Sequence, residues 1–237
     1  MQFFPVFLDL RGRRVLVAGG GRIGLARAVA VVDAGAELLV VDPDPAAAAH
    51  AGLAGTARAR TAVRAFVPED CQGCTLVFAC TADAPTNLAI VAEARRFGAL
   101  ACVAGAGGRP NAGAVTDSPF PGPADFQVGA ILRRGDLCLA VSSGGSSPAL
   151  AAAARDAAAG VIGQEYARAA ELLASAFRDE QAPDGSGGVQ RRTAVHDALG
   201  GGLLELLREG REDEARSLLD AVLARTDAAD PEGRCIR

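Results

Sequence analysis

The sequence has no lysine and no tryptophan, and only two histidines, one tyrosine and one methionine among its 237 residues. Without lysine it offers neither a Schiff-base nucleophile nor the lysine of a phosphate-binding P-loop. A Ser-His-Asp triad or a histidine-rich metal site would have to use His50 or His196, and both lie in helix-like stretches that favour a surface position. We therefore predict no metal site.

Aromatic residues are also scarce, at 4% of the chain, and the formal net charge is −4 with no run of basic residues. Nucleic-acid binding needs a basic surface and often aromatic side chains, so we expect no nucleic-acid partner. An apolar run of transmembrane length and a signal-peptide pattern are absent as well. These absences predict a cytoplasmic protein with no membrane partner and with reduced thiols.

The six cysteines are scattered along the chain. Cys80, Cys102 and Cys138 lie in apolar, strand-like runs, where a cysteine usually acts as a small core residue. Cys71 and Cys74 form a single C-x-x-C pair without a second pair or a nearby histidine. A zinc site or a redox pair there is the less favoured interpretation.

The most informative stretch is RRVLVAGGGRIGLARAVAVVDAGAELLVVD, residues 13–42, which predicts a strand, a glycine turn, a helix and a second strand. Arg14 to Ala18 is a short apolar run typical of a strand buried on both faces. Gly19, Gly21 and Gly24 follow at the spacing G-x-G-x-x-G. The first glycine permits a tight turn, the second lets backbone approach a pyrophosphate, and the third lets the helix pack closely on the strand.

The helix predicted from Arg22 to about Ala34 begins at this turn, so its free N–H groups and the positive end of its dipole face a bound phosphate. Asp42 ends the next strand, about 20 residues beyond the turn, where a carboxylate can accept both ribose hydroxyls of NAD. Its charge would repel the 2′-phosphate of NADP, although Arg22 could offset that repulsion. The pattern predicts dinucleotide binding with NAD favoured; the alternative is a glycine-rich turn that binds nothing.

Strands and helices continue to alternate after Asp42, with a short helix at 46–51, strands at 61–66, 75–80 and 100–104, and a helix at 85–97. Alternation of this kind predicts an α/β fold with a doubly wound parallel sheet of the Rossmann type. Ligands of such sheets bind outside the carboxyl ends of the strands. One crevice would then gather the glycine turn, Asp42, Thr81 to Asp83 and Gly105.

Regular structure stops at residues 105–123, a loop rich in glycine and proline. The following pattern predicts an antiparallel hairpin with strands at 126–132 and 137–142. Helices are then predicted to about residue 178, at 190–208 and at 212–225, with a flexible linker at 182–188 between them. We divide the chain into a Rossmann domain at 1–112, a loop and hairpin segment at 113–150, and a helical domain at 151–237.

Three segments, in this order, resemble one family. FPVFLDLRGRRVLVAGGG at 4–21 is similar to the opening of the siroheme synthase N-terminal domain, the precorrin-2 dehydrogenase/sirohydrochlorin ferrochelatase family. LVFACTADAPTN at 76–87 resembles that family's strand-end pattern with Thr, Asp and a later Asn. DFQVGAILRRGDLCLAVSSGGSSPALA at 125–151 resembles its hairpin and its Ser-Gly-Gly-x-Ser-Pro turn. The resemblance covers residues 1 to about 155; beyond them only the helical character agrees.

The resemblance implies oxidation of precorrin-2 to sirohydrochlorin with NAD as cofactor, in siroheme biosynthesis. It also implies a homodimer whose subunits exchange contacts through the hairpin segment. Ser142 and Ser143 would lie near the tetrapyrrole. The residues predicted to bind the cofactor are Gly19, Gly21, Arg22, Ile23, Gly24, Asp42 and Thr81.

One position departs from the family pattern. Relatives usually carry an aspartate just after the fifth strand, thought to take part in proton removal and metal insertion, and Gly105 stands there in this sequence. Asp117 in the inserted loop, or Asp125 before the hairpin, could substitute, so both are candidate catalytic residues. We expect dehydrogenase activity to persist and iron chelation to be weak or absent.

The substrate implied by the resemblance carries many carboxylates, which guanidinium groups bind through paired hydrogen bonds. Two alternatives stay open: a non-catalytic NAD-binding regulatory module, and a dehydrogenase for another small molecule. The arginines near the predicted crevice, each of which could also be a solvated surface charge, are Arg22, Arg109, Arg133, Arg134 and Arg155.

Overall fold

The computed structural model describes residues 3–49, 56–103, 124–176 and 188–229. Its contacts divide the chain into two compact units, Met1–Val128 and Gly129–Arg237. The division of the sequence into three parts stays a prediction. Within the described ranges, no helix combines the length and the apolar character that crossing a membrane requires.

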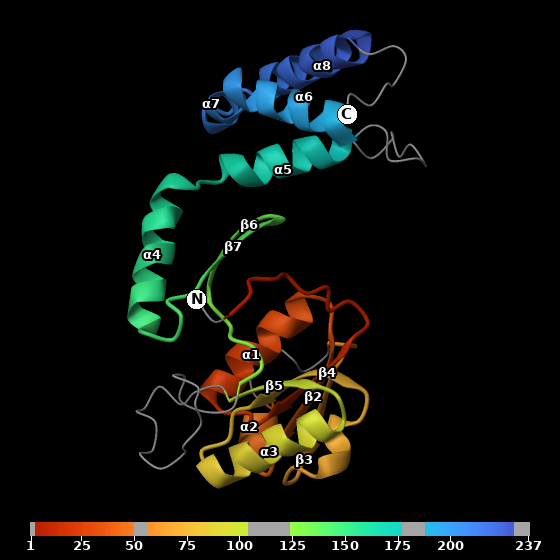
Figure 1. The fold of residues 1–237 in the computed structure, drawn as a ribbon, viewed down its shortest axis with the longest axis vertical. Coiled ribbons are helices and arrows are strands. Elements are labelled where there is room, and N and C mark those ends of the chain that lie inside the picture. The colour runs from red at the N-terminus through yellow and green to blue at the C-terminus, as the bar shows by residue number, and fades with distance from the viewer. Residues whose placement is uncertain (1–2, 50–55, 104–123, 177–187, 230–237) are drawn as a thin grey trace. The chain divides into compact units, whose positions relative to one another are not determined.

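A parallel sheet of five strands forms the centre of the first unit (Figure 1). Its strands are β1 (Arg14–Ala18), β2 (Glu37–Asp42), β3 (Ala59–Val63), β4 (Cys74–Ala79) and β5 (Leu100–Val103). They lie in the order β3-β2-β1-β4-β5, so the winding direction reverses between β1 and β4. The predicted doubly wound sheet is confirmed, and this reversal point is where such sheets bind ligands.

Helices cover both faces of the sheet. α1 (Arg22–Asp33) follows β1, α3 (Ala84–Arg96) follows β4, and they pack against opposite faces (Figure 1). The shorter helices are α2 (Pro45–Ala49) and the 3-10 helix η1 (Pro68–Cys71).

The side chains of β1 explain its central position. Val15 and Val17 belong to the core shared with α1, whereas Leu16 and Ala18 belong to the core shared with α3. All four are fully buried. A strand with apolar residues on both faces is stable only where both faces are covered, so this run sits in the middle of the sheet.

The third strand differs from its prediction. The sequence predicts a strand at 61–66, but β3 occupies Ala59–Val63. Its pairing with β2 runs from Leu38 opposite Ala59 to Asp42 opposite Val63, so β3 ends where its neighbour ends. Residues 64–67 leave the sheet at that point.

The second unit begins with an antiparallel hairpin, β6 (Ala130–Arg134) and β7 (Leu137–Val141), as predicted. Gly135 in its two-residue turn has a φ of 56°, which favours glycine. Helices α5 to α8 share one apolar core, which includes Leu203, Leu207 and Leu219. The helices of this unit are α4 (Pro148–Val161), α5 (Glu165–Ala176), α6 (Gly188–Gly200), α7 (Leu203–Arg208) and α8 (Glu212–Ala229).

Two further predictions need correction. The hairpin strand predicted at 126–132 starts only at Ala130. Phe126 instead packs edge-to-face on Phe78 of the first unit, with ring centroids 5.2 Å apart. The helix predicted at 190–208 is two helices, α6 and α7, because three consecutive glycines interrupt it and Gly202 has a φ of 92°.

Candidate functional site: a cleft at the carboxyl ends of the strands

Glycines shape the turn between β1 and α1. Gly19 has a φ of 102°, and a Cβ atom there would lie 2.6 Å from the carbonyl carbon of Cys80, so only glycine fits. A Cβ atom on Gly24 would overlap the carbonyl oxygen of Gly19, which explains the third glycine. Gly21 differs, because a Cβ atom there would meet no heavy atom within 4 Å. The second glycine thus keeps open space in front of the turn.

A cleft of about 680 Å³ lies at this edge of the sheet, within the size range of small-molecule sites. Its walls come from the glycine turn, the end of β2, and the segments after β3 and β4. The start of α1 also faces it, with neither an acidic residue in the first turn nor a side-chain cap. Its positive end can therefore receive an anion. The predicted cofactor residues in the lining are Gly19, Gly21, Arg22, Ile23, Asp42 and Thr81.

Asp42 joins β2 to the glycine turn. Its Oδ2 accepts a hydrogen bond from the N–H of Gly20 at 2.6 Å, and its Oδ1 accepts one from the N–H of Asp44 at 2.8 Å. Each carboxylate oxygen has a second lone pair, so the group can still accept hydroxyl donors from the cleft.

The opposite wall is held by Asn87, a buried residue of α3. Asn87 Oδ1 accepts hydrogen bonds from the Thr81 N–H at 3.0 Å and from the Thr81 hydroxyl at 2.7 Å. Asn87 Nδ2 donates to the Thr81 carbonyl oxygen at 3.0 Å. One side chain therefore fixes both backbone groups and the side chain of Thr81. The motif at residues 76–87 contains Asn87, but the sequence alone does not assign it a role; its position six residues after Thr81, near the start of the next helix, is the signal that could have done so.

Asp83 stands between these two residues and begins α3. Its Oδ2 accepts hydrogen bonds from the Thr86 N–H at 2.9 Å and from the Thr86 hydroxyl at 2.5 Å. These hydrogen bonds lower the pKa of Asp83. Asp83 and Thr86 both line the cleft, so a negative charge lies on this wall as well as at Asp42.

Asp125 lies at another place in the same unit. Its carboxylate forms an ion pair with Arg95 at 2.7 Å and accepts the N–H of Ala101 at 2.9 Å. Burial raises the pKa of Asp125, but these hydrogen bonds outweigh that effect and the net pKa is lowered. Ala101 is near the amino end of β5, whereas the cleft lies at the carboxyl ends. The structure therefore does not bring Asp125 to the cleft.

The two predicted serines belong to the second unit, in the turn that precedes α4. Ser143 Oγ donates to the carbonyl oxygen of Ser147 at 2.8 Å and accepts its N–H at 3.0 Å. Ser142 Oγ accepts the N–H of Gly144 at 3.1 Å. Ser147 in turn caps α4 by accepting the N–H of Leu150. Both hydroxyls thus help to shape a helix start.

Other predicted residues are dispersed or fall outside the described ranges. Arg155 pairs with its neighbour Asp156 at 2.6 Å, and Arg134 donates to the carbonyl oxygen of Ile162 at 3.0 Å. His196 has an 89% exposed side chain. The residues outside the described ranges are His50, Gly105, Arg109 and Asp117.

The C-x-x-C pair is buried at the junction of η1 and β4. Burial raises the pKa of the Cys71 thiol to about 12 and also raises the pKa of Cys74. Both thiols are therefore protonated at neutral pH, which disfavours redox chemistry and metal binding. In the part of the chain that the structure describes, no three metal-ligating side chains cluster.

Several known proteins are similar to this chain in sequence. Residues 6–115 match the model of a family of NAD(P)-binding domains. The siroheme synthase of Ectopseudomonas mendocina is 36% identical over 229 residues, which cover 94% of this chain and 45% of the relative. The siroheme synthase of Azotobacter vinelandii is 36% identical over 230 residues, with shares of 94% and 45%. The chain thus spans slightly under half the length of these relatives.

A solved structure described as SirC, precorrin-2 dehydrogenase, has the same fold. It matches with a TM-score of 0.66 and 20% sequence identity, over 93% of this chain and 98% of that chain. Two findings therefore agree: this chain shares the fold of that structure, and it is more than 30% identical to several siroheme synthases over nearly all of its length. Over nearly all of its length the chain is thus similar to siroheme synthases, of which it spans under half, and residues 6–115 are similar to NAD(P)-binding domains.

Proposed function

We propose that this protein is an NAD-dependent dehydrogenase that oxidises precorrin-2 to sirohydrochlorin. The observation that carries the proposal is the cleft, in which a glycine turn, an uncapped helix start and a strand-end carboxylate converge. The reaction is suggested by the similar proteins, which are siroheme synthases and a precorrin-2 dehydrogenase.

The cleft residues suit NAD. The open space at Gly21 and the start of α1 would receive the pyrophosphate, and Asp42 would accept the adenosine ribose hydroxyls. Asp42 would also disfavour the 2′-phosphate of NADP by charge repulsion. When bound, the nicotinamide ring accepts a hydride. The protein's task is to hold the reacting carbon of the substrate against that ring.

Removal of a hydride from precorrin-2 must be accompanied by loss of a proton. The Asp125 carboxylate is already engaged by Arg95 and by a backbone N–H, which makes it a poor acceptor. Of the two predicted carboxylates, Asp117 is therefore the favoured proton acceptor. Ser142 and Ser143 stay candidates for contact with the tetrapyrrole.

Chelation is the part of the family's chemistry that this chain is expected to lack. Metal insertion must strip protons from pyrrole nitrogens, so a positioned base helps. The family resemblance implies an aspartate at the position where this chain has Gly105. The test is to supply sirohydrochlorin with cobaltous ion and to compare metallation with the uncatalysed rate. Acceleration by the wild type would contradict this view, and acceleration that survives Asp117→Ala and Asp125→Ala would show that chelation needs neither carboxylate.

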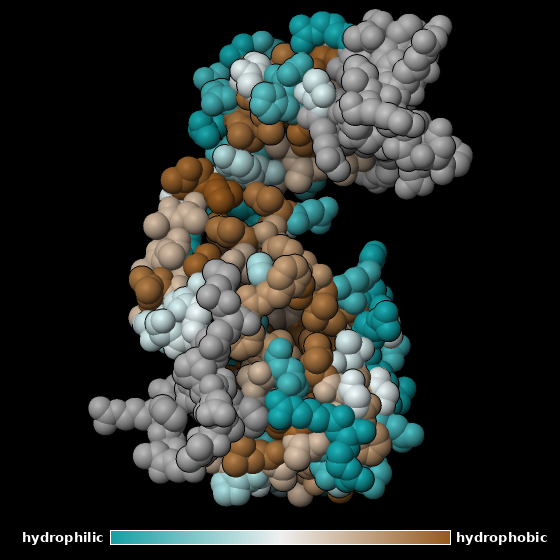
Figure 2. Space-filling view, in the orientation of Figure 1, coloured by the Kyte–Doolittle hydropathy of each residue, from teal (hydrophilic) through white to brown (hydrophobic). Residues whose placement is uncertain are grey.

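We also propose a cytoplasmic homodimer that associates through the second unit. A lone two-stranded hairpin is marginal in water, and apolar side chains stay exposed on the hairpin and α4. Brown shades dominate the surface of α4 in Figure 2. Light scattering at micromolar concentration should give a dimer mass, and a monomer would contradict the proposal. The exposed apolar residues are Ile131, Leu137, Leu150 and Val161.

The deciding experiment is incubation of the full chain with precorrin-2 and NAD without oxygen. Sirohydrochlorin and reduced NAD should form in equal amounts. NAD binding without turnover would instead support a regulatory module. Turnover of another substrate in a screen, with precorrin-2 inert, would support a different dehydrogenase.

A further inference from the structure

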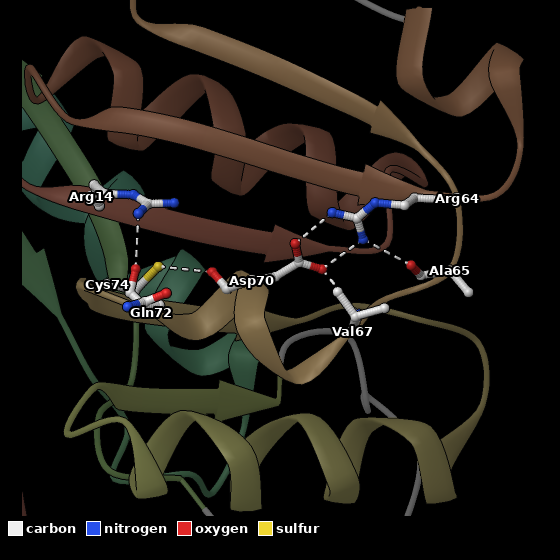
Figure 3. Close-up of polar contacts among 7 residues, drawn as sticks. All are labelled: Arg14, Arg64, Ala65, Val67, Asp70, Gln72 and Cys74. Atoms are coloured by element: carbon white, nitrogen blue, oxygen red, sulfur yellow. Dashed lines mark hydrogen bonds and ion pairs between the residues drawn. The ribbon is translucent and has the colours of Figure 1, made fainter.

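Asp70 is a buried carboxylate next to a segment that lines the cleft, whereas Asp42 is only partly buried. The side chain of Asp70, in η1, is only 5% exposed, yet it forms an ion pair with Arg64 at 2.6 Å (Figure 3). Both oxygens take part, because Arg64 Nη1 donates to Oδ2 at 2.8 Å and Nη2 donates to Oδ1 at 2.6 Å. Oδ2 also accepts the N–H of Val67 at 3.0 Å.

This ion pair encloses the segment that connects β3 to η1. Arg64 begins the segment and also donates to the carbonyl oxygen of Ala65 at 3.0 Å, while Val67 ends it (Figure 3). The two residues between them, Ala65 and Phe66, line the cleft. Asp70 therefore fixes a piece of cleft wall without touching the cleft.

The far end of η1 is anchored to the sheet. Arg14 Nη1, on β1, donates to the carbonyl oxygen of Gln72 at 2.9 Å (Figure 3). Cys74 Sγ, on β4, donates to the carbonyl oxygen of Asp70 at 3.3 Å. Asp70 is thus a fixed support, and its carboxylate holds the segment 64–67 against a rigid part of the fold.

The charge of Asp70 is retained in this place. Burial raises the pKa of the carboxyl group, but the hydrogen bonds from Arg64 and from the Val67 N–H outweigh it, so the pKa stays below the usual aspartate value. An ionised carboxylate with both oxygens used is a stronger clamp than a neutral one.

The clamped segment lies beside the adenosine end of the cleft. Val63 pairs with Asp42 in the sheet, so residues 64–67 leave β3 directly next to the strand end assigned to the adenosine ribose. Phe66 is half-buried and packs on the core under α3, which leaves part of its ring for the cleft. An aromatic ring at that position can stack on a purine base.

We propose that the Asp70–Arg64 ion pair positions Phe66 as the wall against which the adenine ring of the cofactor rests. The inference depends on the proposed NAD binding and adds its adenine-recognition element. Asp70 and Arg64 are positioning residues, since neither needs to touch the cofactor.

The test is calorimetric titration of the full chain with NAD, ADP-ribose and nicotinamide mononucleotide. Asp70→Asn and Phe66→Leu should each weaken NAD and ADP-ribose by about tenfold, within the range seen for loss of one stacking contact. Nicotinamide mononucleotide, which lacks the adenine, should bind as it does to the wild type. The double variant should lose little more than Phe66→Leu alone, because both changes act through one ring.

A matched control is Glu165→Gln. Glu165 is likewise a buried carboxylate paired with an arginine, Arg208 at 2.9 Å, but it lies in the second unit. This change should leave all three affinities unaltered. In turnover, Asp70→Asn should raise KM for NAD and leave kcat unchanged, which a loss of folded protein would not do.

Three outcomes would overturn the inference. Asp70→Asn with wild-type affinity for NAD is one, and equal weakening of NAD and nicotinamide mononucleotide is another. The third outcome applies if Asp70→Asn fails to fold: Phe66→Leu that binds ADP-ribose as tightly as the wild type would also overturn the inference. A wild-type chain that binds no NAD would be recognised separately, because it overturns the proposed function itself.

Discussion

Buried polar side chains occur in both compact units, but they hold different parts in place. In the first unit, Asp70 and Asn87 each fix a segment that leaves the carboxyl end of a strand and lines the cleft. In the second unit, buried Glu165 pairs with Arg208 and so ties α5 to α7. Polar burial in the first unit therefore shapes a ligand site, whereas in the second it joins helices.

The contrast has a consequence for substitutions. Some substitutions in the glycine turn between β1 and α1 should prevent folding, because their side chains would clash with the backbone of the turn. Others should prevent only ligand binding, because their side chains would fill the open space in front of the turn. Changes in the core that helices α5 to α8 share should alter stability alone. Single substitutions in the two units test this contrast.

Gly24→Val should prevent the first unit from folding. Its Cβ would overlap the carbonyl oxygen of Gly19, and α1 cannot retreat without opening the core that it shares with β1. We expect a loss of more than about 3 kcal/mol of unfolding free energy, measured by urea denaturation. Gly160→Ala in exposed α4, where a Cβ meets nothing within 4 Å, is the matched change and should stabilise by about 1 kcal/mol. Equal effects would contradict the packing argument.

Gly21→Val should abolish binding and spare folding. Gly21 has an ordinary φ of −62°, and a Cβ atom there meets no heavy atom within 4 Å, so we expect the backbone of the turn to accept a side chain at this position. We expect NAD affinity to fall by about a hundredfold, since the pyrophosphate can no longer approach the backbone. The unfolding free energy should stay within about 0.5 kcal/mol of the wild type. Undiminished affinity would place the pyrophosphate elsewhere.

The sequence predicts the features that depend on residues close together in the chain. It does not predict the features that depend on contacts between distant residues. The strand, turn and helix at residues 14–33 were predictable because the glycine spacing is a local motif, although the close approach of Gly19 to Cys80 could not be read from it. The role of Asp70 was not predictable, since it depends on where β3 ends, and that end is set by pairing with β2. The sequence pattern assigned Phe126 to a strand. Its contact with Phe78 could not be predicted, because the two residues lie far apart in the chain. Interactions across the fold leave no periodic pattern.

Asp42→Ala should weaken NAD by about tenfold and NADP by less. Both cofactors would lose part of the support that Asp42 gives to the N–H groups of Gly20 and Asp44. Only NAD would lose the ribose acceptor, and only NADP would gain from removal of a repelling charge. Titration calorimetry with both cofactors measures the difference. Equal weakening would show that Asp42 acts on the turn and not on the ribose.

The smallest expected effect concerns Asp125, which joins α3 to the start of β5 away from the cleft. Its pKa in the folded chain lies below that in the unfolded chain, where it is about 3.9. The ionised form therefore stabilises the fold fully above about pH 5, and this contribution is lost as the pH falls through the folded pKa. Asp125→Asn should cost about 1 kcal/mol at pH 7, because Arg95 is partly exposed and solvent screens the pair.

Urea denaturation between pH 7 and pH 3 measures this cost, and the difference between Asp125→Asn and the wild type should shrink toward pH 3. The matched variant is Asp156→Asn, whose side chain is 65% exposed beside Arg155 in the second unit. It should change the unfolding free energy by less than about 0.5 kcal/mol at any pH in that range. Precorrin-2 oxidation per folded molecule should survive Asp125→Asn. A fall in kcat with unchanged stability would instead make Asp125 the proton acceptor. Asp125 would then belong to the catalytic site and not to the contacts that only support the fold of the first unit.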